Sequence, residues 1–291
     1  MKAAPFAYHR AESVKEAADV LAEFGDEAKV LAGGQSLIPL LAMRLTHFEN
    51  LVDISRVPEL QGIDLIDDQV VIGAGTAHAL VGMDDEVADS VPLLSLATPH
   101  IGHFQIRNRG TLGGAIAHAD PAAEFAAVAL TLDATIDAAS SRGDRQIAAA
   151  DFFTGLWENS LAADELLRAV RFPVWSGRTG FAVHEFARRH GDFAIAGATV
   201  AVELDTENRV KRCAVGLLGL GSTPERGTPA ERAITGRTVS DITAAEFGRL
   251  ALSELEDIPA DQQGSASYRT RVGAAMVARA WTDATTEALD A

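Results

Sequence analysis

The stretch Val30–Leu45, VLAGGQSLIPLLAMRL, constrains the fold of this chain more than any other. Val30–Ala32 is apolar enough for the end of a buried strand, and the run after Ser36 has the length of a helix. The pair Gly33-Gly34 between them lets the backbone turn tightly and come close to a ligand. We expect Ser36 to cap the helix, and Pro39 to lie in the first turn, where proline is tolerated.

Two interpretations of this stretch are open. Free backbone N–H groups in a glycine turn and at the start of a helix form a natural anion site, which would suit a diphosphate. The other interpretation is an ordinary tight turn from strand to helix. The stretch is neither a Walker A pattern nor a GxGxxG fingerprint, so taken alone it favours the ordinary turn.

A second stretch, Thr111–Glu124, reads TLGGAIAHADPAAE and again predicts a Gly-Gly turn, followed by a helical segment with a carboxylate. Two such turns could converge on one extended, phosphate-bearing ligand. AGGQSLIPLL and QIRNRGTLGGAIAHADPAAE closely resemble the two flavin motifs of the medium, FAD-binding subunit of the molybdenum hydroxylases. That family includes carbon monoxide dehydrogenase, xanthine dehydrogenase and the bacterial N-heterocycle dehydrogenases. The resemblance covers nearly the whole chain.

Composition limits the classes of function. The net charge of −16 over 291 residues disfavours nucleic acid or an anionic membrane surface as a partner. The single cysteine, Cys213, excludes a disulfide within the chain and an iron–sulfur cluster held by several cysteines of this chain. The N-terminus lacks an apolar signal core and no run reaches membrane-spanning length, so we expect a cytoplasmic protein without membrane insertion.

The pattern of elements predicts an α+β protein. We expect an FAD-binding domain over residues 1–175, with lobes of about 1–57 and 58–175, and a second domain over residues 178–285. The resemblance implies that the first is a two-lobed, PCMH-type FAD-binding domain. It implies that the second is a C-terminal α/β domain of the carbon monoxide dehydrogenase flavoprotein type. In this second domain, Phe181–Phe186, Ala194–Leu204 and Val210–Leu220 are expected strands, and Ser267–Trp281 is an expected helix.

Several polar features have plain interpretations. Gly73–His78 begins like a dinucleotide fingerprint, but His78 replaces the third glycine, so we do not expect a Rossmann site there. His100 and His103 form an H-x-x-H pair without further ligands in a suitable pattern, so no metal site is expected. Arg107 and Arg109 could offset phosphate charge or pair with carboxylates, and we favour a structural role.

The resemblance also implies site residues. The first motif wraps the diphosphate, and the second lies beside it. Their members are Ala32, Gly33, Gly34, Gln35, Ser36 and Leu37, and then Thr111, Leu112, Gly113, Gly114 and Ala115. Ala115 stands where the family often has Asn. His118 stands where the family offers a polar contact, and Glu124 stands where the family usually has an Asp that reaches the ribityl or adjacent chain. Ile101 and Gly102 match a loop that covers the ring system, and Leu167 matches a residue near its apolar side.

The resemblance implies a division of labour. A large partner subunit carries the molybdenum cofactor, and a small one carries two [2Fe–2S] clusters, in a dimer of heterotrimers. This chain would take electrons from the clusters through FAD to an external acceptor, without a catalytic acid–base side chain or a metal of its own. A stand-alone flavin oxidoreductase of related fold is the alternative, and a regulator without cofactor is a third possibility that the intact glycine motifs disfavour.

Overall fold

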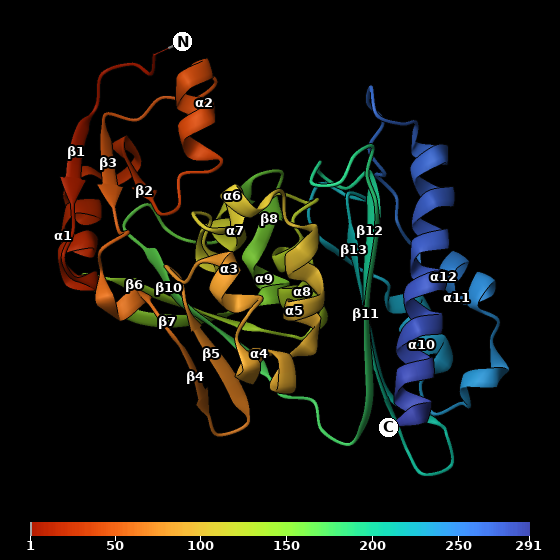
Figure 1. Ribbon diagram of the computed structural model, residues 1–291. Coiled ribbons are helices and arrows are strands. Elements are labelled where there is room, and N and C mark those ends of the chain that lie inside the picture. The colour runs from red at the N-terminus through yellow and green to blue at the C-terminus, as the bar shows by residue number, and fades with distance from the viewer. Residues whose placement is uncertain (1) are drawn as a thin grey trace.

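The computed structural model describes residues 2–291 and contains three main sheets side by side (Figure 1). The N-terminal lobe, drawn in red, lies at one end, and the C-terminal domain, drawn in cyan and blue, lies at the other. Within residues 2–291, no helix combines the length and the apolar character that a bilayer crossing requires.

The N-terminal lobe holds a parallel three-stranded sheet in the order β1-β3-β2. Its first helix begins at Ser13, whose hydroxyl accepts a hydrogen bond from the N–H of Glu16, and ends at Gly25 with a φ of 50°. A serine before the first turn and a glycine after the last are both typical of helix ends. The elements of this lobe are β1 (Ala7–Arg10), α1 (Val14–Phe24), β2 (Ala28–Leu31), α2 (Leu37–Met43) and β3 (Asn50–Asp53).

The second lobe holds an antiparallel sheet in the order β4-β5-β10-β6-β7. Alternation along β10 sends Val170 and Phe172 into the core, both fully buried, while Arg171 between them faces the other side. The strands are β4 (Ile63–Ile66), β5 (Gln69–Gly73), β6 (Thr135–Ser140), β7 (Gly143–Ala148) and β10 (Leu166–Pro173), with a ribbon of β8 (Phe153–Gly155) and β9 (Glu158–Asn159). The helices are α3 (His78–Val81), α4 (Asp85–Ser90), α5 (Pro92–Ala97), α6 (Phe104–Arg107), α7 (Leu112–His118), α8 (Glu124–Thr131) and α9 (Ala149–Phe152).

The C-terminal sheet, β11-β12-β13-β14, is antiparallel and covered by helices on both faces. Helices α5 and α8 of the second lobe pack against one face, and α12 packs against the other (Figure 1). Burial on both faces explains why β12 is almost continuously apolar or small in sequence. The elements are β11 (Arg178–Phe186), β12 (Ala196–Leu204), β13 (Val210–Leu218), β14 (Glu225–Arg226), α10 (Thr228–Ile234), α11 (Ala244–Ala251) and α12 (Ala266–Asp290).

One expected helix start and one expected helix end need correction. Ser36 occupies the position before α2, but its backbone is helical, with φ −101° and ψ −49°, and its side chain makes no capping hydrogen bond. A capping residue needs an extended backbone to aim its oxygen at the helix, so the prediction that Ser36 caps α2 is wrong. Pro39 does lie in the first turn of α2. Helix α12 runs nine residues beyond the expected end at Trp281.

Candidate cofactor site

The first glycine motif presents a row of free backbone donors. The N–H groups of Gly33–Leu37 make no hydrogen bond to any acceptor in residues 2–291. The one hydrogen bond within the loop runs from Nε2 of Gln35 to the carbonyl of Gly33, at 2.9 Å. Gly34 has a φ of 71°, a left-handed conformation that glycine adopts readily. Free backbone N–H groups in a glycine turn are the donors that an anion site uses.

The second glycine motif is a helix and not the turn expected from the sequence. Gly113 and Gly114 lie in the first turn of α7, after Thr111, whose hydroxyl accepts a hydrogen bond from the N–H of Gly114 at 3.1 Å. The N–H groups of Leu112 and Gly113 donate to carbonyls of the neighbouring segment, each at 3.0 Å. Because these donors are occupied, the second motif offers close backbone approach and few free N–H groups.

The segment Gly73–His78 supports the second motif. The carbonyls of Ala74 and Thr76 accept the hydrogen bonds from Gly113 and Leu112. A Cβ atom on Gly113 would lie 2.4 Å from the Cβ of Ala74, so only glycine permits this contact. The helix that follows, α3, spans only His78–Val81, too short for a dinucleotide fold. The glycines of this segment pack elsewhere: a Cβ atom on Gly73 would lie 2.5 Å from the carbonyl oxygen of Leu60, and one on Gly75 would lie 2.3 Å from Nε2 of Gln61.

The two glycine motifs touch each other. A Cβ atom on Gly33 would lie 2.1 Å from the carbonyl oxygen of Arg109, and one on Gly114 would lie 3.4 Å from the Cβ of Ala32. Arg107 donates hydrogen bonds to the carbonyls of Ile101 and Gly102, each at 3.0 Å, and so holds their loop in place. This agrees with the structural role favoured for Arg107, although its partners are carbonyls and not the carboxylates considered earlier.

His118 ends α7 and stacks on an exposed tryptophan. Its ring lies 6.4 Å from that of Trp157, with only 6° between the two planes. The indole N–H of Trp157 donates to Asp120 at 3.1 Å, which fixes the tryptophan at the tip of the β8–β9 hairpin. Burial lowers the pKa of His118. Trp157, which the sequence reasoning missed, forms an aromatic wall beside His118.

Glu124 begins α8 and is nearly buried, with 8% of its surface exposed. Burial, together with the negative charge of Glu185, raises the pKa of Glu124 to about 8. Glu185 comes from β11 of the C-terminal domain, and nothing in the sequence pattern relates it to Glu124, 61 positions earlier. Ile101 and Leu167 lie in the core of the second lobe, and Gly102 has a φ of +48°.

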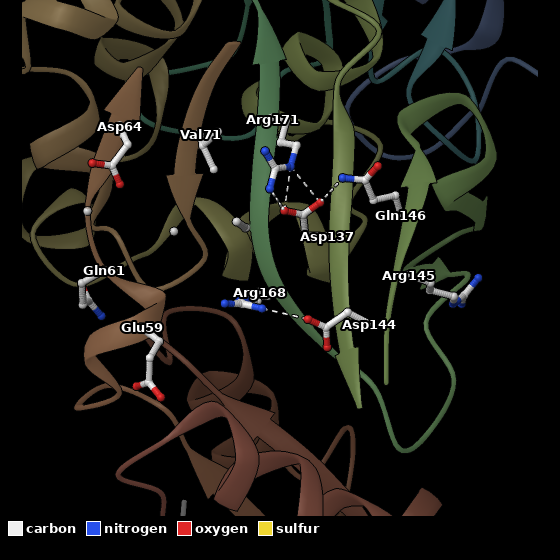
Figure 2. Close-up of a pocket in the computed structure, with 13 residues that line it drawn as sticks. Glu59, Gln61, Asp64, Val71, Asp137, Asp144, Arg145, Gln146, Arg168 and Arg171 are labelled. Carbon is white, nitrogen blue, oxygen red and sulfur yellow. Dashed lines mark hydrogen bonds and ion pairs between the residues drawn. The ribbon is translucent and has the colours of Figure 1, made fainter. Parts of the chain in front are cut away.

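A separate hollow lies on the open face of the second sheet (Figure 2). It has a volume of about 540 Å³ and is lined mainly by charged and polar side chains. Arg168 pairs with Asp144 at 2.8 Å, and Arg171 pairs with Asp137 at 2.8 Å, as the dashed contacts show. Arg145 pairs with Glu165 at 2.7 Å. Since each arginine is neutralised by a carboxylate, this hollow does not present a site for an anion.

The histidine pair near residue 100 does not form a metal site. Within residues 2–291, no group of three or more His, Cys, Asp or Glu side chains is arranged to hold a metal ion. Nδ1 of His100 lies 3.3 Å from Oε1 of Glu185. The ring of His103 lies 6.4 Å from that of His190. The two histidines therefore have different neighbours and do not converge on one point.

Comparison with known proteins decides the family. Residues 4–175 match the model of the FAD binding domain in molybdopterin dehydrogenase. The chain belongs to this family of FAD-binding subunits. Residues 181–284 match the carbon monoxide dehydrogenase flavoprotein C-terminal domain. FAD is therefore the cofactor of this chain, and the chain is an oxidoreductase subunit of the molybdenum hydroxylase family.

Individual relatives match over almost their full length. The chain is 42% identical to 6-hydroxypseudooxynicotine dehydrogenase complex subunit alpha from Paenarthrobacter nicotinovorans, over 96% of this chain and 94% of the relative. It is 37% identical to caffeine dehydrogenase subunit beta from Pseudomonas sp. strain CBB1, over 96% and 95%. Its structure matches a chain of carbon monoxide dehydrogenase from Hydrogenophaga pseudoflava, with a TM-score of 0.95, 34% identity and 99% coverage of both chains.

The residues present fit FAD. The unoccupied N–H groups of Gly33–Leu37 suit the diphosphate, because backbone donors bind phosphate oxygens without a full positive charge. The contact between the two motifs leaves no space for a side chain on Gly33, and a Cβ atom on Gly114 would lie 2.8 Å from the hydroxyl oxygen of Thr111 in its own motif. Among the residues predicted from the sequence, the structure brings the members of the two motifs together. His118 and Glu124 follow the second motif directly in the chain, at the end of α7 and the start of α8.

Proposed function

We propose that this chain holds FAD along the two glycine motifs and passes electrons from [2Fe–2S] clusters of a partner to an external acceptor. The observation that carries the assignment is the row of unoccupied N–H groups at Gly33–Leu37, in contact with the start of the second motif. FAD, when bound, supplies the redox chemistry, and the chain supplies binding, orientation and electrostatics.

The individual roles follow from the position of each residue. Ala32, Gly33, Gly34, Gln35, Ser36 and Leu37 are proposed to surround the diphosphate through backbone N–H groups. Thr111, Leu112, Gly113, Gly114 and Ala115 are proposed to give the close backbone surface beside it. His118 and Glu124 are proposed as polar contacts, and Ile101, Gly102 and Leu167 as neighbours of the ring system. No side chain is assigned an acid–base step, because the chain is proposed to relay electrons.

The partners belong to the same proposal. Carbon monoxide dehydrogenase medium chains are among the relatives, at 34% identity for that of Hydrogenophaga pseudoflava. A medium chain implies large and small companions. We propose a large molybdenum subunit and a small [2Fe–2S] subunit, assembled as a dimer of heterotrimers in the cytoplasm. The boundary between the FAD-binding domain and the C-terminal domain is proposed to lie between residues 175 and 178.

Substitution of the glycines tests the site. In Gly33→Val the side chain meets the backbone of Arg109, and in Gly114→Val it meets Thr111 and Ala32. We expect both variants to keep their circular dichroism spectrum and to lose most bound FAD, measured by flavin absorbance per protein. Gly236→Ala, which strains the backbone at a φ of +81° in open space outside both motifs, controls for general destabilisation and should keep FAD. Full flavin occupancy in both valine variants would show that the site is assigned wrongly.

A further inference from the structure

The loop that carries Ile101 and Gly102 is contacted by the C-terminal domain at two points. Nδ1 of His100 lies 3.3 Å from Oε1 of Glu185, which is in β11. A Cβ atom on Gly191, in the turn between β11 and β12, would lie 3.1 Å from the carbonyl carbon of Gly102. The C-terminal domain therefore contacts both the residue that precedes Ile101 and the residue that follows it.

The contact between Glu185 and His100 lies mostly out of solvent. The side chain of Glu185 is 7% exposed, and that of His100 is 32% exposed. Oε2 of Glu185 is buried without a hydrogen-bond partner in residues 2–291, and His100 is the one basic side chain of those residues that pairs with the carboxyl group. A buried carboxyl group without any polar partner is costly. Displacement of His100 from Glu185 is therefore unfavourable.

This contact fixes a different property of the loop from the one that Arg107 fixes. Arg107 donates hydrogen bonds to the carbonyls of Ile101 and Gly102, each at 3.0 Å. Because Arg107 follows these residues closely in the chain, its hydrogen bonds set the local shape of the loop. Glu185 belongs to another domain, so its contact with His100 sets the position of the loop relative to the C-terminal sheet.

We propose that Glu185 is a positioning residue of the flavin site, which holds His100 and thereby keeps Ile101 and Gly102 beside the flavin ring. The proposal rests on the assignment of Ile101 and Gly102 as neighbours of the ring in the proposed function. Glu185 acts through His100 and does not itself contact the cofactor. Because Glu185 lies in the C-terminal domain, that domain contributes to flavin binding even though both glycine motifs lie in the FAD-binding domain.

Loss of the contact should weaken FAD binding without abolishing it. The glycine motifs stay intact, but the loop loses its fixed position, and a site that is competent for part of the time binds more weakly in proportion. We expect the Kd for FAD of the full-length chain to rise about tenfold in Glu185→Ala and in His100→Ala, as for a loop that is correctly placed about a tenth of the time. Flavin fluorescence quenching on binding measures the Kd. Visible circular dichroism of the bound flavin, which reports the surroundings of its ring, should change in both variants.

Three further variants separate positioning from general destabilisation. Glu185→Gln keeps a side chain of the same length whose amide can hydrogen-bond to the imidazole, so it should restore most of the affinity. Glu203→Ala removes another largely buried glutamate of the same sheet, paired with Lys211 at the opposite end of the β11–β12 ladder, and should keep the wild-type Kd and dichroism. The double variant Glu185→Ala/His100→Ala should bind FAD no more weakly than either single variant, because each removes the same contact.

Unchanged Kd and visible dichroism in both alanine variants, or effects that multiply in the double variant, would overturn the role of Glu185. If Glu185→Ala does not fold, His100→Ala decides, because its side chain is partly exposed. If Gly33→Val and Gly114→Val lose FAD while both alanine variants bind it as the wild type does, only the role of Glu185 is wrong. If the valine variants keep FAD, the assignment of the FAD site fails, and the role of Glu185 fails with it.

Discussion

At the scale of single residues, His78 shows how one side chain holds the second glycine motif. Its Nε2–H donates to the carbonyl of Thr111 at 2.8 Å, and its backbone N–H donates to that of Gly110 at 2.9 Å. The ring meets the edge of Phe125, with centroids 5.1 Å apart. Nδ1 is buried without a partner, so a proton there would be poorly stabilised. Burial lowers the pKa of His78 to about 4.

This depressed pKa predicts a loss of stability in acid. Between about pH 6.5 and about pH 4 the unfolded chain protonates His78 and the folded chain does not, so stability falls as pH falls through this window. At pH 4.5 this difference in protonation lowers the free energy of unfolding by about 2.5 kcal/mol relative to neutral pH. We expect His78→Gln to be less stable than wild type near pH 7 but to lose less stability on acidification, measured by urea unfolding at both pH values. His47→Gln, an exposed histidine, is the control, and equal losses in His78→Gln and wild type would contradict the prediction.

Site residues that are close together in the sequence could be predicted from it, whereas contacts between residues far apart in the sequence could not. The glycine pairs and their neighbours were visible because each motif is contiguous. The role of His78 was only partly visible: its place in a broken fingerprint excluded a dinucleotide site but did not identify Thr111 as its partner, 33 positions later. Trp157 carried no local signal, since only the packing of the β8–β9 hairpin against the end of α7 brings it to His118. Ser36 failed as a cap because residue type does not determine the backbone angle there.

At the scale of elements, strands that are buried could be predicted from the sequence, and strands that are mostly exposed could not. Strands β12 and β13 are buried on both faces, and their apolar runs predicted their extents to within two residues at each end. Strands β4 and β7 were missed, because nearly all their residues are exposed or half-exposed and charged groups interrupt the apolar pattern. The last turns of α12 were missed because Thr282–Glu287 is rich in threonine, a weak helix former. Packing of Ala284 and Ala288 on the sheet stabilises them.

Helix α12 is tied to the sheet by a buried arginine. Arg269, 4% exposed, donates to the carbonyl of Ile195, to that of Gly219 at 3.1 Å, and to Asp261 at 2.7 Å. The acceptors are on three separate loops, so one planar guanidinium group joins the helix to the start of β12 and the end of β13. An uncharged side chain of similar size would leave the two carbonyls without donors.

We therefore expect Arg269→Met to lower the free energy of unfolding by about 3 kcal/mol, because buried carbonyls lose charged donors. Arg269→Lys should recover only part of this, since an ammonium group cannot span the same acceptors. Arg271→Met is the matched control on the same helix, where the arginine is exposed, and it should change stability by less than about 0.5 kcal/mol. Denaturant unfolding of the three variants measures the changes in the free energy of unfolding. Similar losses in Arg269→Met and Arg271→Met would show that the hydrogen bonds of Arg269 contribute little to stability.

At the scale of the whole molecule, the second lobe lies between the other two units and shares a helix layer with the C-terminal sheet (Figure 1). Helix α8 contributes to this layer on one side, and Glu124 at its start belongs to the proposed cofactor site. A buried hydrogen bond of 2.6 Å between Thr131 at the end of α8 and Thr199 in β12 joins the two units. This bond holds the end of α8 against the C-terminal sheet, while the start of α8 carries Glu124 of the proposed cofactor site.

The last prediction concerns the division of labour in the complex. We expect the isolated, FAD-loaded chain to oxidise none of the organic substrates of its parent complex, because it is proposed to relay electrons without an acid–base site of its own. The flavin absorbance should still be bleached by dithionite under anaerobic conditions. Addition of the molybdenum and iron–sulfur subunits should restore bleaching by substrate, and the Gly33→Val chain, as a control without FAD, should restore none. Substrate-dependent bleaching by the lone chain, with partner subunits excluded by mass spectrometry, would favour a stand-alone flavin oxidoreductase, since such an enzyme needs no second chain to reduce its flavin.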